Sequence, residues 1–118
     1  MEQSKALAAL QALSHPARLE LVRLLVPEGE TGLCAGDIAG RLCLSASRLS
    51  FHLSALEAAG LLRSRKVARH VIYRVDPQGM GQTISYLLSD CCRDHPEVHA
   101  CCAHPPQAVA KLSPPPEP

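Results

Sequence analysis

The segment DCCRDHPEVHACC (90–102) holds four of the six cysteines of this 118-residue chain. They form two adjacent pairs, Cys91 with Cys92 and Cys101 with Cys102, and His95 and His99 lie between the pairs. Thiolates and imidazoles bind soft and borderline metal ions, and paired thiols also carry redox chemistry. This segment is therefore the first candidate for a functional site.

The compartment decides which thiol chemistry is relevant. Glu2 and Lys5 stand near the start, and the sequence has no export signal and no apolar run of membrane length. We therefore expect a cytoplasmic protein with no membrane partner. Because cytoplasmic thiols are kept reduced, six cysteines there favour metal binding or redox chemistry over a framework of disulfides.

Four helices are predicted ahead of the segment. Leucines at helical spacing indicate an opening helix that ends near Ser14, because Pro16 disfavours helix in the residue before it. Pro16 suits the first turn of a second helix. The further helices span residues 34–45 and 46–60, the last with Ser45 as N-cap and Gly60 as C-cap.

Period-two alternation of β-branched residues then predicts a two-stranded hairpin over residues 61–76, and a fifth helix follows over 77–92. Residues 45–76 carry six basic side chains against two acidic ones, a net charge of +4 in a chain whose total is only +1. The predicted organisation is a domain over 1–90, a Cys/His-rich segment of candidate metal ligands over 91–104 and a proline-rich, disordered tail over 105–118.

Two consecutive short helices followed by a basic hairpin are typical of a winged helix-turn-helix. LSHPARLELVRLL, GDIAGRL, LSASRLSFHLSALEAAGLLRSRK and RHVIYRV, together about two-thirds of the chain, resemble the ArsR/SmtB family of bacterial metal-responsive repressors. The resemblance implies a mainly α fold of about five helices with a small β-hairpin wing. It also implies a homodimer that binds double-stranded operator DNA and releases it when a metal or metalloid binds.

By this resemblance, the fourth helix enters the major groove and the hairpin approaches the DNA backbone or minor groove. The predicted DNA-binding residues are Ser45, Ser47, Arg48, Ser50 and His52 on the helix, with Arg65, Lys66 and Arg69 on the wing. Two of these assignments have an equally weighted alternative. The sole role of Ser45 could be to cap its helix, and the sole role of His52 could be to form hydrogen bonds within the scaffold. Phe51 replaces a residue that is often polar in the family, and the wing turn lacks the family's usual glycine.

The resemblance also implies several alternative inducer sites. One needs Cys-x-Cys on the third helix, but Gly36 follows Cys34 at that spacing, so this site is broken. We expect Cys34 and Cys43 to be small, partly buried residues. Another site needs carboxylates and histidines on the fifth helix, and residues 78–89 contain none. The pattern SDCCRDHPEVHACC instead resembles the cysteine site of arsenic-responsive members.

Trivalent arsenic binds three thiolates in a pyramid. Side chains of adjacent helical residues point about 100° apart, so Cys91 and Cys92 need a third thiol folded back from Cys101 or Cys102. Pro96 is expected to stop the helix, and residues 93–100 would form the return loop. The sequence therefore predicts a repressor induced by As(III), inorganic or methylated, or by Sb(III).

Other interpretations stay open. Zinc or cadmium could draw ligands from the same thiols together with His95, His99 and His104, although contiguous cysteines reach one tetrahedral ion poorly. A redox-responsive repressor would need only a thiol pair. A thiol metallochaperone would not need the basic hairpin. No arginine follows Cys91 or Cys92 at the spacing of a phosphatase loop, so no enzyme is expected.

Overall fold

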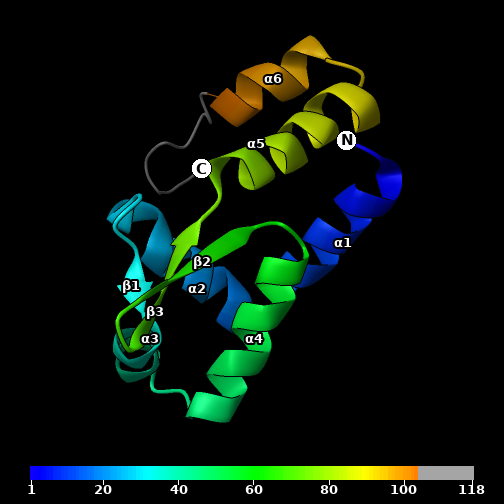
Figure 1. The fold of residues 1–118 in the computed structure, drawn as a ribbon. Coiled ribbons are helices and arrows are strands. Elements are labelled where there is room, and N and C mark those ends of the chain that lie inside the picture. Colours follow the sequence, from blue (N-terminus) through cyan, green and yellow to red (C-terminus); the bar gives the residue numbers. More distant parts are fainter. Residues whose placement is uncertain (104–118) are drawn as a thin grey trace, which may run out of the picture. The chain divides into compact units, whose positions relative to one another are not determined.

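The computed structural model describes residues 1–103, and the predicted tail at 105–118, like the alternative ligand His104, lies outside them. Within that part, six α-helices and three strands follow the order of a winged helix-turn-helix (Figure 1). Their bounds, with two short segments of other helical types, are α1 Gln3–Leu13, α2 Pro16–Leu25, η1 Val26–Glu28, β1 Leu33–Cys34, α3 Ala35–Leu42, α4 Ala46–Ala58, β2 Leu62–Val67, β3 His70–Val75, α5 Pro77–Ser85, η2 Tyr86–Cys91 and α6 Pro96–Ala103.

Caps set the helix boundaries much as predicted. His15 accepts a hydrogen bond at Nδ1 from the Ala17 backbone N–H (3.1 Å), and Pro16 occupies the first turn of α2. Ser45 Oγ accepts from the Arg48 N–H at the start of α4 (3.3 Å), which confirms it as the N-cap. Gly60 follows the end of α4 with φ of 82°, a left-handed conformation that glycine adopts at little cost.

The hairpin is confirmed, and it belongs to a three-stranded antiparallel sheet in the order β1-β3-β2. Leu62 pairs with Val75 and Val67 with His70. Leu33 of β1 pairs with Tyr73, an additional strand that a two-stranded wing does not include. Two residues are too few to show a period, so this strand exists only through its pairing with β3.

Leucines from α2, α4 and the start of β2 form the core of residues 1–83, together with one isoleucine from α3. The largest fully buried side chains are Leu21, Leu25, Ile38, Leu53, Leu56, Leu61 and Leu62. Gly79 lies so close to the Gly60 carbonyl that an added Cβ would fall 1.8 Å from its oxygen. The start of α5 therefore packs against the turn after α4 only because Gly79 carries no side chain.

The described part of the chain divides into two compact units, with the boundary after Thr83. In the second unit the fifth helix becomes a π-helix, η2, and its ordered turns end at Cys91. The prediction of a return loop over 93–100 was wrong, because Pro96 begins α6 instead of only stopping a helix. Proline suits a first helical turn, where the backbone N–H it lacks would have no partner. None of the helices in the described part is long and apolar enough to cross a membrane.

Candidate nucleic-acid interface and thiol cluster

Helix α4 has one buried and one exposed side. Leu49, His52, Leu53 and Leu56 are buried. The predicted DNA-binding residues Ser45, Ser47, Arg48 and Ser50 are exposed. A helix-turn-helix needs this arrangement, because its second helix must be anchored on one side and leave the other free for DNA.

His52 differs from the other predicted DNA-binding residues of α4 because it is buried. It is only 5% exposed, and its Nδ1 accepts a hydrogen bond from Arg18 Nε on α2 (3.1 Å). The ring centroid of His15 lies 4.6 Å from that of His52. Burial lowers the pKa of His52, and the positive charges of His15, Arg18 and Arg48 lower it further. A neutral, buried imidazole bonded to Arg18 braces α4 against α2, which argues against direct contact with DNA.

The basic residues of the sheet fall into two groups. Lys66 and Arg69 are exposed at the tip, and neither side chain makes a hydrogen bond or salt bridge within residues 1–103. Arg65 instead donates to the backbone carbonyls of Glu30 (3.0 Å) and Thr31 (3.1 Å). Arg65 therefore fastens the wing to the loop before β1, while Lys66 and Arg69 remain exposed at its tip.

Acidic partners fix the base of the wing. Arg63 Nε lies 3.1 Å from Asp76 Oδ2, and Ser64 Oγ donates to Glu57 at the end of α4 (2.6 Å). Burial alone would raise the pKa of Asp76, but hydrogen bonds from Arg63 and from the backbone N–H of Gln78 and Gly79 lower it below its ordinary value. The wing is thus attached to α4 and to the start of α5. Sequence reasoning missed these brace residues because their partners lie in other elements, Glu57 in α4 and Asp76 directly after β3.

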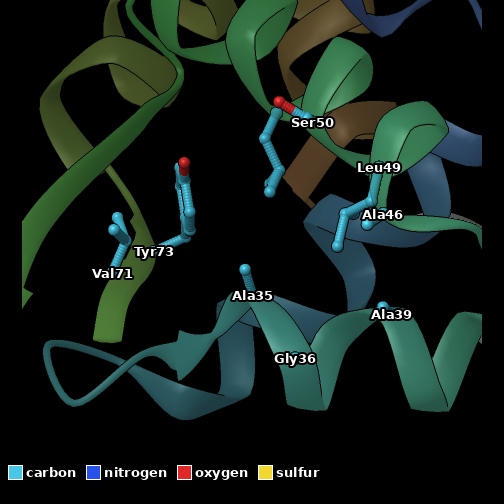
Figure 2. A pocket seen from close by; sticks show the side chains of 9 residues that line it. Ala35, Gly36, Ala39, Ala46, Leu49, Ser50, Val71 and Tyr73 are labelled. Atoms are coloured by element: carbon cyan, nitrogen blue, oxygen red, sulfur yellow. The ribbon is translucent and has the colours of Figure 1, made fainter. Parts of the chain in front are cut away.

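A cavity of about 210 Å³ separates α3, α4 and β3. Figure 2 shows Ala35, Gly36 and Ala39 along α3, with Ser50 of α4 and Tyr73 of β3 facing them. Burial, together with the nearby Glu57, raises the pKa of the Tyr73 hydroxyl, which therefore stays protonated. Ligand pockets usually exceed about 300 Å³, so we interpret this hollow as loose packing between small side chains.

The thiol cluster lies in the second unit. Cys91 is exposed and Cys92 half-buried, and none of the six cysteines is in a disulfide. Beyond η2, which ends at Cys91, Arg93 and Asp94 both have positive φ (54° and 55°). Burial raises the pKa of Cys92, and a hydrogen bond to Cys91 raises it further. The thiol form of Cys92 is therefore favoured in this arrangement.

Asp94 connects the end of η2 to α6. Its Oδ1 accepts from Ser89 Oγ (3.0 Å) and lies 3.1 Å from His99 Nε2. The hydrogen bonds from His99 and then Ser89 lower the pKa of Asp94 below its ordinary value. His95 Nδ1 accepts from the Glu97 N–H (3.2 Å) at the start of α6. Both histidines between the cysteine pairs thus already have partners on or beside α6.

The donor chemistry of this segment fits a thiophilic ligand, but its arrangement does not assemble a site. Cys101 and Cys102 are exposed on α6 and line a shallow hollow with His95, Glu97 and Val98. No group of three His, Cys, Asp or Glu residues within the described chain lies close enough to hold one metal ion. Binding through three thiols therefore requires α6 or the end of η2 to move. The predicted ligand set stays a prediction.

The remaining thiols lie elsewhere. Cys34 ends β1 and is half-buried, as expected, but Cys43 is exposed just after α3, so its predicted partial burial was wrong. Cys43 has a φ of 55°, which turns the chain from α3 toward α4. It therefore faces solvent as the C-cap of α3 instead of packing between the two helices.

Comparison with known proteins agrees with this geometry. Residues 13–65 match the model of a helix-turn-helix domain. The chain is 33% identical over 88 residues to the HTH-type transcriptional regulator YgaV of Escherichia coli, covering 75% of this chain and 87% of that protein. It is 37% identical over 84 residues to the transcriptional activator HlyU of Vibrio cholerae, covering 71% and 75% respectively.

An arsenical resistance operon repressor of Escherichia coli is 40% identical over 65 residues, a match that covers 55% of this chain and 54% of that protein. Among solved structures, an ArsR-like transcriptional regulator from Rhodococcus superposes with a TM-score of 0.66 at 28% identity. That superposition covers 92% of this chain and 96% of the other. The similarity therefore includes the fold, the recognition helix and the wing.

Proposed function

This chain belongs to the ArsR/SmtB family of winged-helix transcriptional regulators, and we propose that it is a repressor induced by trivalent arsenic. It binds operator DNA as a homodimer through α4 and the wing. Arsenic on the thiols of residues 91–102 then weakens this binding. The relatives include regulators of more than one kind, so they do not by themselves indicate arsenic. Support for the arsenic-specific part comes from the thiol segment.

Exposed positive charge on two elements supports the DNA-binding role. Arg48 lies near the N-terminus of α4, while Lys66 and Arg69 occupy the tip of the wing. Phosphate contacts by wing cations position a protein on the duplex, and side chains of the recognition helix read base edges. A homodimer suits this role because two recognition helices then meet two half-sites related by symmetry.

The observation that carries the arsenic proposal is the concentration of four free thiols in a single short segment. Three thiolates suit As(III) or Sb(III), which are soft and thiophilic. Cys91 and Cys92 would supply two ligands, and Cys101 or Cys102 the third. A methylated trivalent arsenical would need only two.

The movement of α6 or of the end of η2 that three-thiol binding requires would be the switch. Left-handed Arg93 and Asp94 join η2 to α6. The side-chain bonds of Asp94 reinforce that junction, together with backbone hydrogen bonds from Asp94 N–H to the Leu88 carbonyl (2.8 Å) and from His95 N–H to the Cys92 carbonyl (3.0 Å). Ligation across the junction would displace α6 or unwind the last turn of η2. Couplings between sites in allosteric proteins are typically about 1–3 kcal/mol, which corresponds to a loss of operator affinity of about 5- to 150-fold.

A variant series tests the site assignment. We expect Cys91→Ser together with Cys92→Ser to leave operator affinity unchanged in fluorescence anisotropy and to abolish release by arsenite. The matched control, Cys34→Ser with Cys43→Ser, removes two thiols outside the segment and should release normally. Release that persists in the first variant and disappears in the control would move the inducer site to α3.

A divalent-metal sensor is the second candidate. His95, Glu97, Cys101 and Cys102 line one shallow hollow, although no three of these described residues lie close enough to hold an ion without movement of α6. Once brought together, this donor set would suit zinc or cadmium better than arsenic. Release by zinc or cadmium in the unaltered protein that is lost in His95→Ala would favour this alternative. Release by peroxide alone would instead identify a redox-responsive regulator.

A further inference from the structure

Phe51, the only phenylalanine of the chain, has 66% of its surface exposed on α4. Single exposed apolar side chains are common, so exposure alone has no functional meaning. The position of Phe51 is what distinguishes it. Helical spacing places it between Ser47 and Ser54, on the side of α4 opposite the buried Leu49 and Leu53.

The Phe51 ring is held in place from behind. The Arg18 guanidinium lies 5.5 Å from the ring centroid, and the ring of His52 meets Phe51 edge-on at 5.6 Å. Arg18 is itself fixed by its hydrogen bond to His52. A side chain held on one side and free on the other is preorganised for contact, because little rotamer freedom is lost when it binds.

The neighbours of Phe51 on the exposed side of α4 are polar. Ser47 and Arg48 line a hollow with Phe51, and Ser54 lies on its other side along the helix. The ring is therefore the large apolar group that α4 presents where a recognition helix meets base edges. In the major groove, the apolar group that a base pair offers is the C5 methyl of thymine.

We infer that Phe51 is a specificity-determining residue that packs on the C5 methyl of a thymine in the operator. This inference rests on the proposed DNA binding through α4 and adds which base chemistry the helix selects. Packing against the sugar-phosphate chain would also bury the ring, but it would not discriminate between sequences. Only packing on thymine makes the operator affinity depend on a single methyl group of one base.

Replacing thymine by deoxyuridine removes only that methyl group. A duplex is first selected from a random library by the full-length, reduced protein, and each thymine is then replaced in turn. For the unaltered protein, we expect about a three- to fivefold loss of affinity at one or two positions in each half-site, the value of one apolar methyl contact. Phe51→Ala should bind the thymine duplex more weakly by a similar factor. Its affinity should not change when uracil replaces thymine at those positions.

Leu19→Ala is the matched control, since Leu19 is another exposed apolar side chain (49%) but belongs to α2. It should retain the full effect of uracil. The inference is overturned if no thymine responds to loss of its methyl group, or if the response survives in Phe51→Ala. Failure to select any duplex would overturn the proposed function together with this inference, whereas sequence-specific binding that is indifferent to uracil would overturn the inference alone.

Discussion

At the scale of single residues, His52 joins α4 to α2, because it is buried and its Nδ1 accepts a hydrogen bond from Arg18 Nε (3.1 Å). The sequence places it in the same motif as the exposed serines of the recognition helix, and both a DNA-reading and a bracing role were consistent with that motif. Its burial against Arg18 depends on how α2 crosses α4, which local spacing does not encode. By contrast, Ser45 was predictable as a cap because capping is a local interaction.

The lowered pKa of His52 makes fold stability depend on pH. Between that lowered pKa and the ordinary value of 6.5, the unfolded chain binds a proton that the folded chain does not. The contribution of His52 is therefore complete above about pH 6.5 and is lost as the pH falls below it. Urea denaturation between pH 7.5 and 5 should show a smaller decline in His52→Gln than in the unaltered protein. His70→Gln, at an exposed position on β3, should keep the original decline; equal pH profiles for all three proteins would refute this role of His52.

At the scale of elements, periodicity predicted the longer helices and the hairpin, and it missed β1 and α6. Strand β1 has only two residues and exists through pairing with Tyr73. Helix α6 was missed because Pro96 was interpreted as a stop signal, although proline is equally suited to the first turn of a helix. Boundaries that depend on caps could be predicted, whereas β1 depends on a distant partner and α6 on a proline that is compatible with either a helix end or a helix start.

The basic residues of the wing have two proposed roles, since Arg65 holds the fold together whereas Lys66 and Arg69 contact DNA. The salt dependence of operator affinity distinguishes these roles. Lys66→Ala or Arg69→Ala should lower the slope of log affinity against log salt by about 1, because one phosphate contact is lost. Arg65→Ala should keep that slope and instead destabilise the fold, since Arg65 bonds the Glu30 and Thr31 carbonyls. Anisotropy titrations across salt concentrations, with urea denaturation alongside, measure both effects. A reduced slope in Arg65→Ala would show that it contacts DNA after all.

Helix α3 carries a glycine that its fold does not require. A Cβ at Gly36 would meet no atom within 4 Å, so Gly36→Ala should raise the free energy of unfolding by about 0.5–1 kcal/mol. Gly79→Ala is the opposite case, because its Cβ would collide with the Gly60 carbonyl; it should cost about 1–3 kcal/mol. Urea denaturation compares the two. Destabilisation by Gly36→Ala would mean that α3 needs its close approach to α4 and β3.

At the scale of the whole molecule, DNA-binding elements occupy one compact unit and the thiol cluster the other. The sequence indicated both groups of residues, and the roles of the first in binding DNA and of the second in binding a metalloid stay predictions. It could not predict that three thiols would fail to meet in the described structure, because that outcome depends on the helical conformation of residues 96–103. The proposed switch therefore combines a built recognition surface with a ligand site that forms only on binding.

The most direct measurement is the fluorescence anisotropy of the reduced protein on a duplex from its own promoter, titrated in parallel with arsenite, zinc and cadmium. Our account predicts release by arsenite at concentrations at which zinc and cadmium leave the complex intact. Release by zinc or cadmium alone, or a complex that no titrant dissociates, would contradict it.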